Sequence, residues 1–256
     1  MAKMKNQKKI SIIIAAAGNA SRLGNEHLIS KQFLLLNGKP LLIHSLEKFV
    51  SLQNAFEIII VTNDMVPTSK LFEDFDFLNK VQIKVVEGGS LRQDSVYNGF
   101  CNVDSSVDLV VIHDVARPLF KIEDLEKCIE EASTSGAAVL ATPLVDTVKC
   151  AKSDKDRLIV KNTLNRNELF LIQTPQVFSY NLLSNAYKMF RVNNSKQVVT
   201  DEANMVEMLG ESVNLVLGDR RNIKISYPED LEIASIFLKE ISKQRPKKVT
   251  MNIGAF

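Results

Sequence analysis

Short runs rich in Ile and Val alternate along this 256-residue chain with longer amphipathic segments. Short apolar runs are typical of strands buried on both faces of a parallel sheet, and amphipathic segments are typical of helices that cover it. The pattern therefore predicts an α/β fold with a mainly parallel sheet and helices on both faces. The expected strands are Ile10–Ala16, Phe56–Thr62, Val81–Glu87, Asp108–His113, Ala137–Thr142 and Val213–Leu217. The expected helices are Leu41–Val50, Leu91–Phe100, Ile122–Ser133, Tyr180–Arg191 and Glu229–Lys243, the last preceded by a capping-box spacing from Ser226 to Glu229.

The chain shows no repeat, low-complexity tract or Gly/Ser-rich linker, so we expect a single domain over residues 1–256. Its longest strongly apolar stretches, such as Ile10–Ala17, run for about eight residues, well below the ~20 of a transmembrane helix. This stretch follows four lysines and could be a signal peptide, but a buried first strand fits better because the run leads into a Gly-containing loop. Three scattered cysteines without zinc or redox spacing favour a reducing compartment. We therefore expect a cytoplasmic protein with no membrane segment.

Eight of the 32 basic residues lie in two terminal stretches, residues 1–9 and 243–256, which contain no acidic residue. The rest of the chain carries the remaining 24 basic residues and all 30 acidic ones, so its body is mildly acidic. A nucleic-acid partner is not expected, because such partners bind basic surfaces. We expect the tails, at about residues 1–8 and 244–256, to be flexible.

One segment interrupts the alternation of strands and helices. Residues 147–152 and 157–164 flank the polar turn 153–156 and alternate roughly between apolar and polar side chains, which predicts a β-hairpin. A two-stranded hairpin alone is marginal in water. We therefore expect an arm at about residues 146–166 that packs against a second subunit of a homodimer.

The loop after the first strand could bind phosphate. Glycine at position 18 lets backbone amides approach a ligand, and Arg22 and Lys31 add positive charge, which together suit a polyphosphate. Neither common nucleotide fingerprint is present, and by spacing alone a plain loop is equally compatible. Lys224, in an expected short strand, could meet phosphate or could be a solvated edge charge.

Two further loops carry polar groups at strand ends. Asp114 could hold a hydrated Mg²⁺ while Arg117 meets a phosphate; alternatively, Asp114 caps the next turn and pairs with Arg117. His113 is more simply an interior histidine than a base. The backbone at Gly88-Gly89 could read a base edge with help from Ser95, or form a plain turn before a helix. Together the loops indicate a phosphate ligand at the sheet edge.

Taken in chain order, these segments resemble the 2-C-methyl-D-erythritol 4-phosphate cytidylyltransferase family of the non-mevalonate isoprenoid pathway. The resemblance covers nearly the whole chain, from Ile10 to about Leu238. It is carried by Ala16-Ala17-Gly18 with Arg22, Lys31-Gln32-Phe33, Gly38-Lys39-Pro40, Gly88-Gly89 with Arg92 and Ser95, His113-Asp114 with Ala116-Arg117-Pro118, Asp146-Thr147-Val148-Lys149, Gln173-Thr174-Pro175-Gln176, Thr200-Asp201-Glu202-Ala203, and Asn222-Ile223-Lys224 with Pro228-Glu229-Asp230-Leu231.

The resemblance implies a Rossmann-like nucleotidyltransferase fold with a β-arm exchanged across a homodimer. It also implies the reaction of CTP with a polyol phosphate, 2-C-methyl-D-erythritol 4-phosphate, in the presence of Mg²⁺ or another divalent cation. Catalytic charge stabilisation would come from Arg22, Lys31 and Lys224. Nucleotide binding would involve Ala16, Ala17, Gly18, Gly89, Ser90 and Ser95. The acceptor would meet Asp114, Arg117 and Thr147, and, in the neighbouring subunit, Arg166 and Thr174; Asp114 would also orient the metal.

The sequence departs from the family pattern in the loop before Lys31. Ala20 stands where a second glycine is usual, Ser30 stands where proline is usual, and the stretch from Asn25 is about two residues longer. This loop leaves two alternatives open. One is a ribitol-5-phosphate cytidylyltransferase, and the other is a catalytically inactive homologue that only binds nucleotide.

Overall fold

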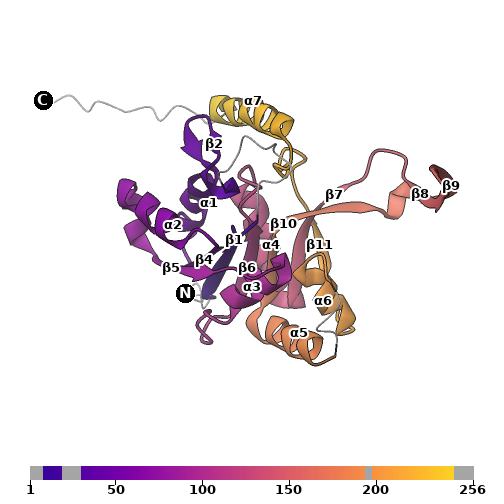
Figure 1. Cartoon of the computed structure of the whole chain (residues 1–256). Helices are drawn as coiled ribbons and strands as arrows, with labels where there is room; N and C mark the ends of the chain where they lie inside the picture. The colour runs from indigo at the N-terminus through magenta and orange to yellow at the C-terminus, as the bar shows by residue number, and fades with distance from the viewer. Residues whose placement is uncertain (1–7, 19–29, 194–197, 245–256) are drawn as a thin grey trace, which may run out of the picture.

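A seven-stranded sheet forms the centre of the computed structural model, which describes residues 8–18, 30–193 and 198–244. The strand order is β11-β7-β10-β6-β1-β4-β5, and every pairing is parallel except the two that β10 makes with β6 and β7 (Figure 1). The strands are β1 Ile10–Ala15, β4 Ala55–Thr62, β5 Gln82–Glu87, β6 Leu109–Asp114, β7 Ala137–Pro143, β10 Phe170–Ser179 and β11 Asn214–Leu217. The predicted mainly parallel α/β sheet is confirmed.

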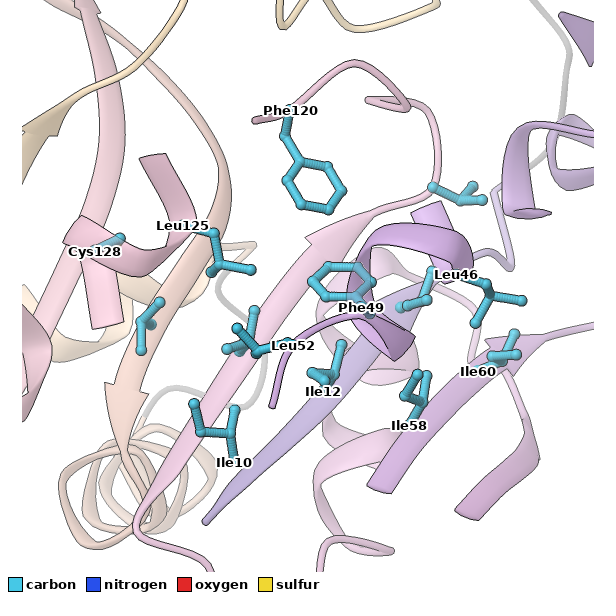
Figure 2. Close-up of a cluster of buried hydrophobic side chains, with 14 of the residues drawn as sticks. Ile10, Ile12, Leu46, Phe49, Leu52, Ile58, Ile60, Phe120, Leu125 and Cys128 are labelled. Atoms are coloured by element: carbon cyan, nitrogen blue, oxygen red, sulfur yellow. The ribbon is translucent and has the colours of Figure 1, made fainter. Parts of the chain in front are cut away.

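Helices cover both faces of this sheet. Helices α1 (Leu41–Val50) and α4 (Ile122–Ser135) pack on one face, where Figure 2 shows Leu46 and Phe49 of α1 near Ile12 and Ile58 of the strands. The opposite face is covered by α3 Arg92–Phe100, α5 Tyr180–Asn193 and α6 Glu202–Met208. Successive side chains of a strand point to opposite faces of the sheet, so they pack alternately against the two helix layers. Every side chain of β6 is buried.

Shorter elements complete the described chain. Helix α7 (Pro228–Gln244) packs near the small sheet of β2 (Leu35–Leu36) and β3 (Lys39–Pro40), around buried Leu36 and Ala234. Helix α2 (Met65–Leu71) follows β4. The remaining short 3-10 turns are η2 Lys31–Phe33, η3 Phe72–Asp74, η4 Asp76–Lys80 and η5 Arg166–Glu168. No helix within the described ranges is long and apolar enough to cross a bilayer.

The six strands predicted for the main sheet and the five predicted helices are all present, with ends that agree within two residues. The main omission is β10, which lies in the middle of the sheet. Its centre, Gln173 to Gln176, is polar and includes Pro175, a residue that argues against a central strand because it cannot donate to the ladder. The ladder with β7 shifts register between Ile172 and Gln176, which accommodates this interruption.

The predicted hairpin is also present, as β8 (Lys149–Asp154) and β9 (Arg157–Thr163). Figure 1 shows it projecting from the body, beyond β7 and β10. All side chains of β9 are exposed, and that of Leu158 is 82% exposed. The arm therefore exists as expected within one subunit, while its place in a dimer stays a prediction.

Two local predictions near the C-terminus are wrong. Residues 222–226, around Lys224, form no strand, and Ile225 makes a backbone hydrogen bond of 2.8 Å to Ala116 instead. The cap of α7 is not the predicted pair of Ser226 and Glu229. The Asp230 carboxylate accepts hydrogen bonds from the backbone amides of Ser226 and Tyr227, at 2.7 and 2.8 Å. Asp230, one residue after Glu229, is thus the acidic residue that caps the first turn of α7.

Several predictions concern residues outside the described ranges. These are Arg22, Ala20, the stretch of residues 25–29 before Ser30, and nearly all of both tails. At the inner ends of the tails, the Lys8 ammonium donates to the Ser133 carbonyl at 3.1 Å, and α7 continues to Gln244.

Candidate active site

A cavity of about 480 Å³ lies at the carboxyl ends of the parallel strands β1 and β6. Parallel α/β sheets bind ligands at this edge because the loops that leave the strands converge there. The cavity is lined by Ala15, Ala17, Gly18, Lys31, Asn63, Gly89, Ser90, Leu91, Arg92, Ser95, Asp114, Val115, Ala116, Lys224 and Ser226. Eight predicted site residues are among them: Ala17, Gly18, Lys31, Gly89, Ser90, Ser95, Asp114 and Lys224.

Asp114, the last residue of β6, lies at the centre of an ionic network. Its Oδ1 accepts a hydrogen bond from Arg92 Nε at 3.0 Å, and its Oδ2 accepts one from Lys224 Nζ at 2.6 Å. The Nη1 atom of Arg92 also donates to both carboxylate oxygens of Glu202, at 3.2 and 3.0 Å. The alternative in which Asp114 pairs with its neighbour Arg117 is therefore wrong.

The charges in this network stabilise one another. Burial disfavours the charged form of Asp114, but Arg92 and Lys224 outweigh it and hold the pKa of this carboxyl well below its usual value. Burial also opposes the charge of Arg92, and Glu202 with Asp114 reverses this effect and raises its pKa. Burial raises the pKa of Glu202, while its ion pair with Arg92 acts in the opposite direction. Both oxygens of Glu202 accept hydrogen bonds, so the geometry fits its carboxylate form.

The Gly88-Gly89 loop lies tightly against the loop that follows β1. A Cβ atom on Gly88 would lie 2.4 Å from the Cβ of Ala17 and 2.6 Å from Oδ1 of Asn63, so only glycine fits there. The Gly89 amide donates to Ser95 Oγ at 3.0 Å, and this hydroxyl donates to the Leu91 carbonyl at 3.0 Å. Ser95 therefore fixes the loop that contributes Gly89 to the cavity wall, and recognition of a base by this loop stays a prediction.

Lys31 and Lys224 reach the same cavity from distant parts of the sequence. Lys31 begins η2, and its Nζ donates to the carbonyl of Ile225 at 3.3 Å, next to Lys224. The adjacent Gln32 is fully buried and donates to Thr62 Oγ1 at 2.9 Å and Asp64 Oδ2 at 3.0 Å. Gln32 thus anchors the turn that carries Lys31 to the end of β4.

Five predicted site residues among those described are not in the cavity wall, and three of them belong to the body of the subunit. Ala16 is buried in the core, where its amide donates to the Val61 carbonyl at 2.8 Å. Arg117 donates to the carbonyls of Asn222 at 2.8 Å and Ile172 at 3.2 Å, so it braces the backbone on two sides. Thr174 Oγ1 accepts from the Asp114 amide at 3.0 Å and contacts His113 Nδ1 at 3.1 Å. An outward reach of Thr174 to a second subunit does not fit this burial.

The two predicted residues on the arm lie away from the cavity of their own subunit. Thr147 is exposed at the beginning of the arm, and Arg166 is exposed in η5, where its Nη1 donates to the Val145 carbonyl at 2.9 Å. The expectation that His113 is an interior residue is confirmed. It is fully buried, and desolvation lowers its pKa to about 3.

Arg92 and Glu202 belong to the ionic network of the cavity edge, although the motifs gave neither of them a role. An Arg in the first turn of a helix after a glycine loop is a signal that could have pointed to Arg92. For Glu202 the only signal was its place in the motif Thr200-Asp201-Glu202-Ala203, and its pairing with Arg92 could not be predicted because the two residues are 110 positions apart.

The fit of a divalent cation can be tested on Asp114. No group of three or more His, Cys, Asp and Glu side chains in the described parts of the chain could hold a metal by itself. Mg²⁺ commonly binds through one or two carboxylates together with substrate phosphates. Asp114 is the only carboxylate in the described cavity wall, and each of its oxygens has a further lone pair. A cation that arrives with a polyphosphate therefore fits.

Topology and cavity together define a class: a Rossmann-like α/β protein with a cavity at the sheet edge, whose wall combines glycine-loop backbone and lysines, groups that suit a nucleotide phosphate. A sequence model of the 2-C-methyl-D-erythritol 4-phosphate cytidylyltransferase family matches residues 10–240. This chain belongs to that family of nucleotidyltransferases.

Relatives and solved structures agree with this assignment. The proteins of that name from Desulforamulus reducens and Clostridium botulinum (strain Langeland) are 41% and 40% identical, over 90% and 91% of this chain and 96% and 99% of their own. The 4-diphosphocytidyl-2C-methyl-D-erythritol synthase of Anaerococcus prevotii has a TM-score of 0.76 at 31% identity, and covers 91% of this chain and 97% of its own. The Francisella tularensis cytidylyltransferase gives 0.73 at 32% identity, over 89% and 99%. The resemblance inferred from the motifs is confirmed, and the ribitol-phosphate alternative is disfavoured.

Proposed function

We propose that this protein transfers a cytidylyl group from CTP to 2-C-methyl-D-erythritol 4-phosphate, giving 4-diphosphocytidyl-2-C-methyl-D-erythritol and pyrophosphate. Family membership supports the reaction class. The observation that carries the assignment within this chain is the convergence of Lys31, Lys224 and the glycine-loop backbone on one cavity.

The acceptor's phosphate oxygen attacks the α-phosphorus of CTP in line. A new P–O bond forms, and the bond from the α-phosphorus to the bridging oxygen of pyrophosphate breaks. The attacking phosphate is already an anion at neutral pH, so no general base is needed and catalysis reduces to positioning and charge stabilisation. Lys31 and Lys224, with Arg22, neutralise the charge that develops on the triphosphate. The burial of His113, which keeps its imidazole neutral, supports a mechanism without a histidine base.

Recognition of cytosine falls to the loop that contains Gly89 and Ser90, whose backbone lines the cavity. Cytosine presents an amino donor and a carbonyl acceptor, which backbone carbonyls and amides can pair with. Asp114, together with the substrate phosphates, would hold Mg²⁺ or another divalent cation. When bound, this cation neutralises part of the triphosphate charge.

The acceptor site is proposed to be shared between two subunits of a homodimer. Thr147 and Arg166 lie on the arm, away from the cavity of their own subunit, and are exposed. They are therefore free to serve the cavity of a partner. Thr174 and Arg117 support the acceptor site indirectly. Thr174 bonds the Asp114 amide, and Arg117 bonds the Asn222 carbonyl. We also expect the chain to act as one domain in the cytoplasm, on the linker and cysteine patterns of its sequence.

The decisive experiment offers the purified protein CTP and Mg²⁺ with each polyol phosphate separately and as a mixture. We expect pyrophosphate release and a methylerythritol product with 2-C-methyl-D-erythritol 4-phosphate. Turnover with ribitol 5-phosphate alone would reassign the acceptor. Binding of CTP without pyrophosphate release from either alcohol would identify an inactive homologue.

A further inference from the structure

The buried carboxylate of Glu202 does not line the cavity, yet it is bonded to a side chain that does. Glu202 is the first residue of α6 and is fully buried, and both its oxygens accept hydrogen bonds from Nη1 of Arg92. Arg92 lines the cavity and bonds Asp114 through Nε. Arg92 therefore links Glu202 to Asp114, the carboxylate at the centre of the site.

Two further contacts hold the segment around Glu202 in place. Gln93, next to Arg92 in α3, accepts a hydrogen bond from the Val199 amide at 2.8 Å. Asp201 caps α6 by accepting the Asn204 amide at 3.0 Å, and its other oxygen accepts the Gln176 side-chain amide at 2.8 Å. Neighbouring side chains of α3 thus reach the same short segment, which is also tied to the central strand β10. The segment that carries Glu202 is therefore held from two sides, which suits a supporting residue.

The two cations bound to Asp114 are held unequally. The Lys224 side chain is 44% exposed, and Asp114 is its only carboxylate partner among the described ion pairs. The Arg92 side chain is 29% exposed and is shared between Asp114 and the fully buried Glu202. The positive charges of Arg92 and Lys224 are balanced by the carboxylates of Asp114 and Glu202, so the cluster has no excess positive charge to attract a triphosphate. Lys224 is the cation that can leave this cluster, since it is the more exposed and has the fewer anchors.

We propose that Glu202 is a positioning residue: it holds Arg92 on Asp114, so that Asp114 keeps its orientation when Lys224 turns from it to the triphosphate. This inference rests on the proposed cytidylyl transfer for its catalytic consequence. A guanidinium suits the task because its planar fork can bond two carboxylates at once, whereas an ammonium cannot reproduce that geometry.

The test is a double-mutant cycle of Glu202→Gln and Arg92→Lys, read from kcat and from the KM for CTP. Glu202→Gln alone should lower kcat about tenfold, with the KM for CTP within about twofold, because the loss of a supporting contact typically costs that much activity. In the Arg92→Lys background the same substitution should cost less than about twofold, because it acts through Arg92.

A matched control is Glu57→Gln. Glu57 is also fully buried and pairs with Lys84 at 2.6 Å, but it lies in β4 near the opposite end of the sheet. This variant should lower the thermal midpoint and leave kcat at the wild-type value. If Glu202→Gln behaves in the same way, Glu202 is merely structural and the inference is wrong. Equal losses of kcat in both backgrounds of the cycle also overturn it.

A second readout separates this inference from the proposed function. In ¹⁵N-labelled protein with CTP bound, the Arg92 Nε–H should exchange slowly with solvent, and Glu202→Gln should accelerate this exchange about tenfold. The measurement needs no turnover. A wild type that releases no pyrophosphate would therefore refute the proposed reaction, while the exchange rate would still decide the role of Glu202. An unchanged exchange rate overturns the inference.

Discussion

The cavity edge of the sheet and the β8–β9 arm differ in where their side chains find partners. The edge satisfies its buried charges within one subunit, whereas the arm leaves its side chains exposed. At the edge, Asp114 and Glu202 are buried and satisfied by cations of the same chain. On the arm, nearly every side chain is exposed, including Leu158 and Val160, at 82% and 56%. The buried carboxylates of the edge find their cations within one subunit, whereas the arm presents apolar surface without a core.

This difference indicates which part of the protein is preformed. A buried ionic network holds its geometry because breaking it leaves an uncompensated charge in a low-dielectric interior. An exposed two-stranded hairpin gains little from its own contacts and needs a surface to pack on. We therefore expect the nucleotide half of the site to be assembled in each subunit, and the acceptor half to depend on assembly.

The largest effect should come from the cavity edge. Lys224→Ala should lower kcat about 10²- to 10³-fold, because a cation placed on the triphosphate acts mainly on charge that develops in the transition state. Asp114 keeps its bond to Arg92 in this variant, so the fold should persist. Steady-state kinetics with CTP and the methylerythritol acceptor, together with a thermal melt, measure both quantities.

The control for this substitution is Lys39→Ala. Lys39 is similarly exposed and ion-paired, to Glu47 at 2.6 Å, but it lies in β3 outside the cavity wall. Its kcat should stay within about twofold of the wild type, because exposed ion pairs contribute little. Wild-type turnover by Lys224→Ala would refute the role of the preformed edge.

The second test concerns the stability of the body. Burial lowers the pKa of His113 to about 3, below its ordinary value of 6.5, so protonation favours the unfolded chain. The resulting stability is fully present above about pH 6.5 and is lost as the pH falls towards 3. The free energy of unfolding should fall by about 2 kcal/mol between pH 7 and pH 5 through this group. Urea denaturation at the two pH values measures it.

His113→Gln should remove most of this pH dependence. A smaller dependence should remain from His44, whose pKa burial also lowers. If the variant shows the same loss of stability between the two pH values as the wild type, His113 does not control it.

The third test is directed at the arm. Leu158→Asp should weaken the homodimer about 10- to 100-fold, because it places a charge in an interface that apolar contacts are expected to form. Sedimentation velocity over a range of concentrations gives the dissociation constant. Val192→Asp is the matched control, since Val192 is equally exposed, at 82%, but lies on α5. Equal behaviour of the two variants would argue against an arm-mediated dimer.

The smallest effect should be the most specific. Arg166→Ala should raise the KM for the acceptor about tenfold and leave the KM for CTP nearly unchanged, because a uniform binding contact to one substrate is lost. Arg157→Ala, at the far end of the same arm, serves as the control. A change confined to the KM for CTP would contradict a shared acceptor site.

Local patterns in the sequence were sufficient for most of the framework. The strands and helices follow from hydrophobic periodicity, because a side chain's face is fixed by its position within one element. The hairpin follows from its alternating pattern and polar turn. The sequence also indicated that the Gly88-Gly89 loop lies at a strand end near the site. The structure shows why position 88 needs glycine, since a Cβ there would clash with Ala17.

Contacts between distant segments could not be predicted in this way. Strand β10 escapes the periodicity because its buried centre is polar. The partners of its side-chain amides lie in distant segments: Gln173 donates to the Asp219 carbonyl and Gln176 donates to Asp201. Thr174 was expected at a subunit boundary, and its contacts with His113 and Asp114 place it inside. The sequence shows that a buried polar residue needs a hydrogen-bond partner, but it does not show which residue that partner is.

The sequence alone therefore determined the architecture, the family and the chemical identity of the cations, since these depend on local pattern and residue type. Only the tertiary structure decided that Asp114 pairs with Arg92 and Lys224 rather than with Arg117, and that Glu202 stands behind Arg92. The physical reason is that an ion pair depends on distances of a few ångströms between atoms, and the packing of the whole sheet and its helices sets those distances.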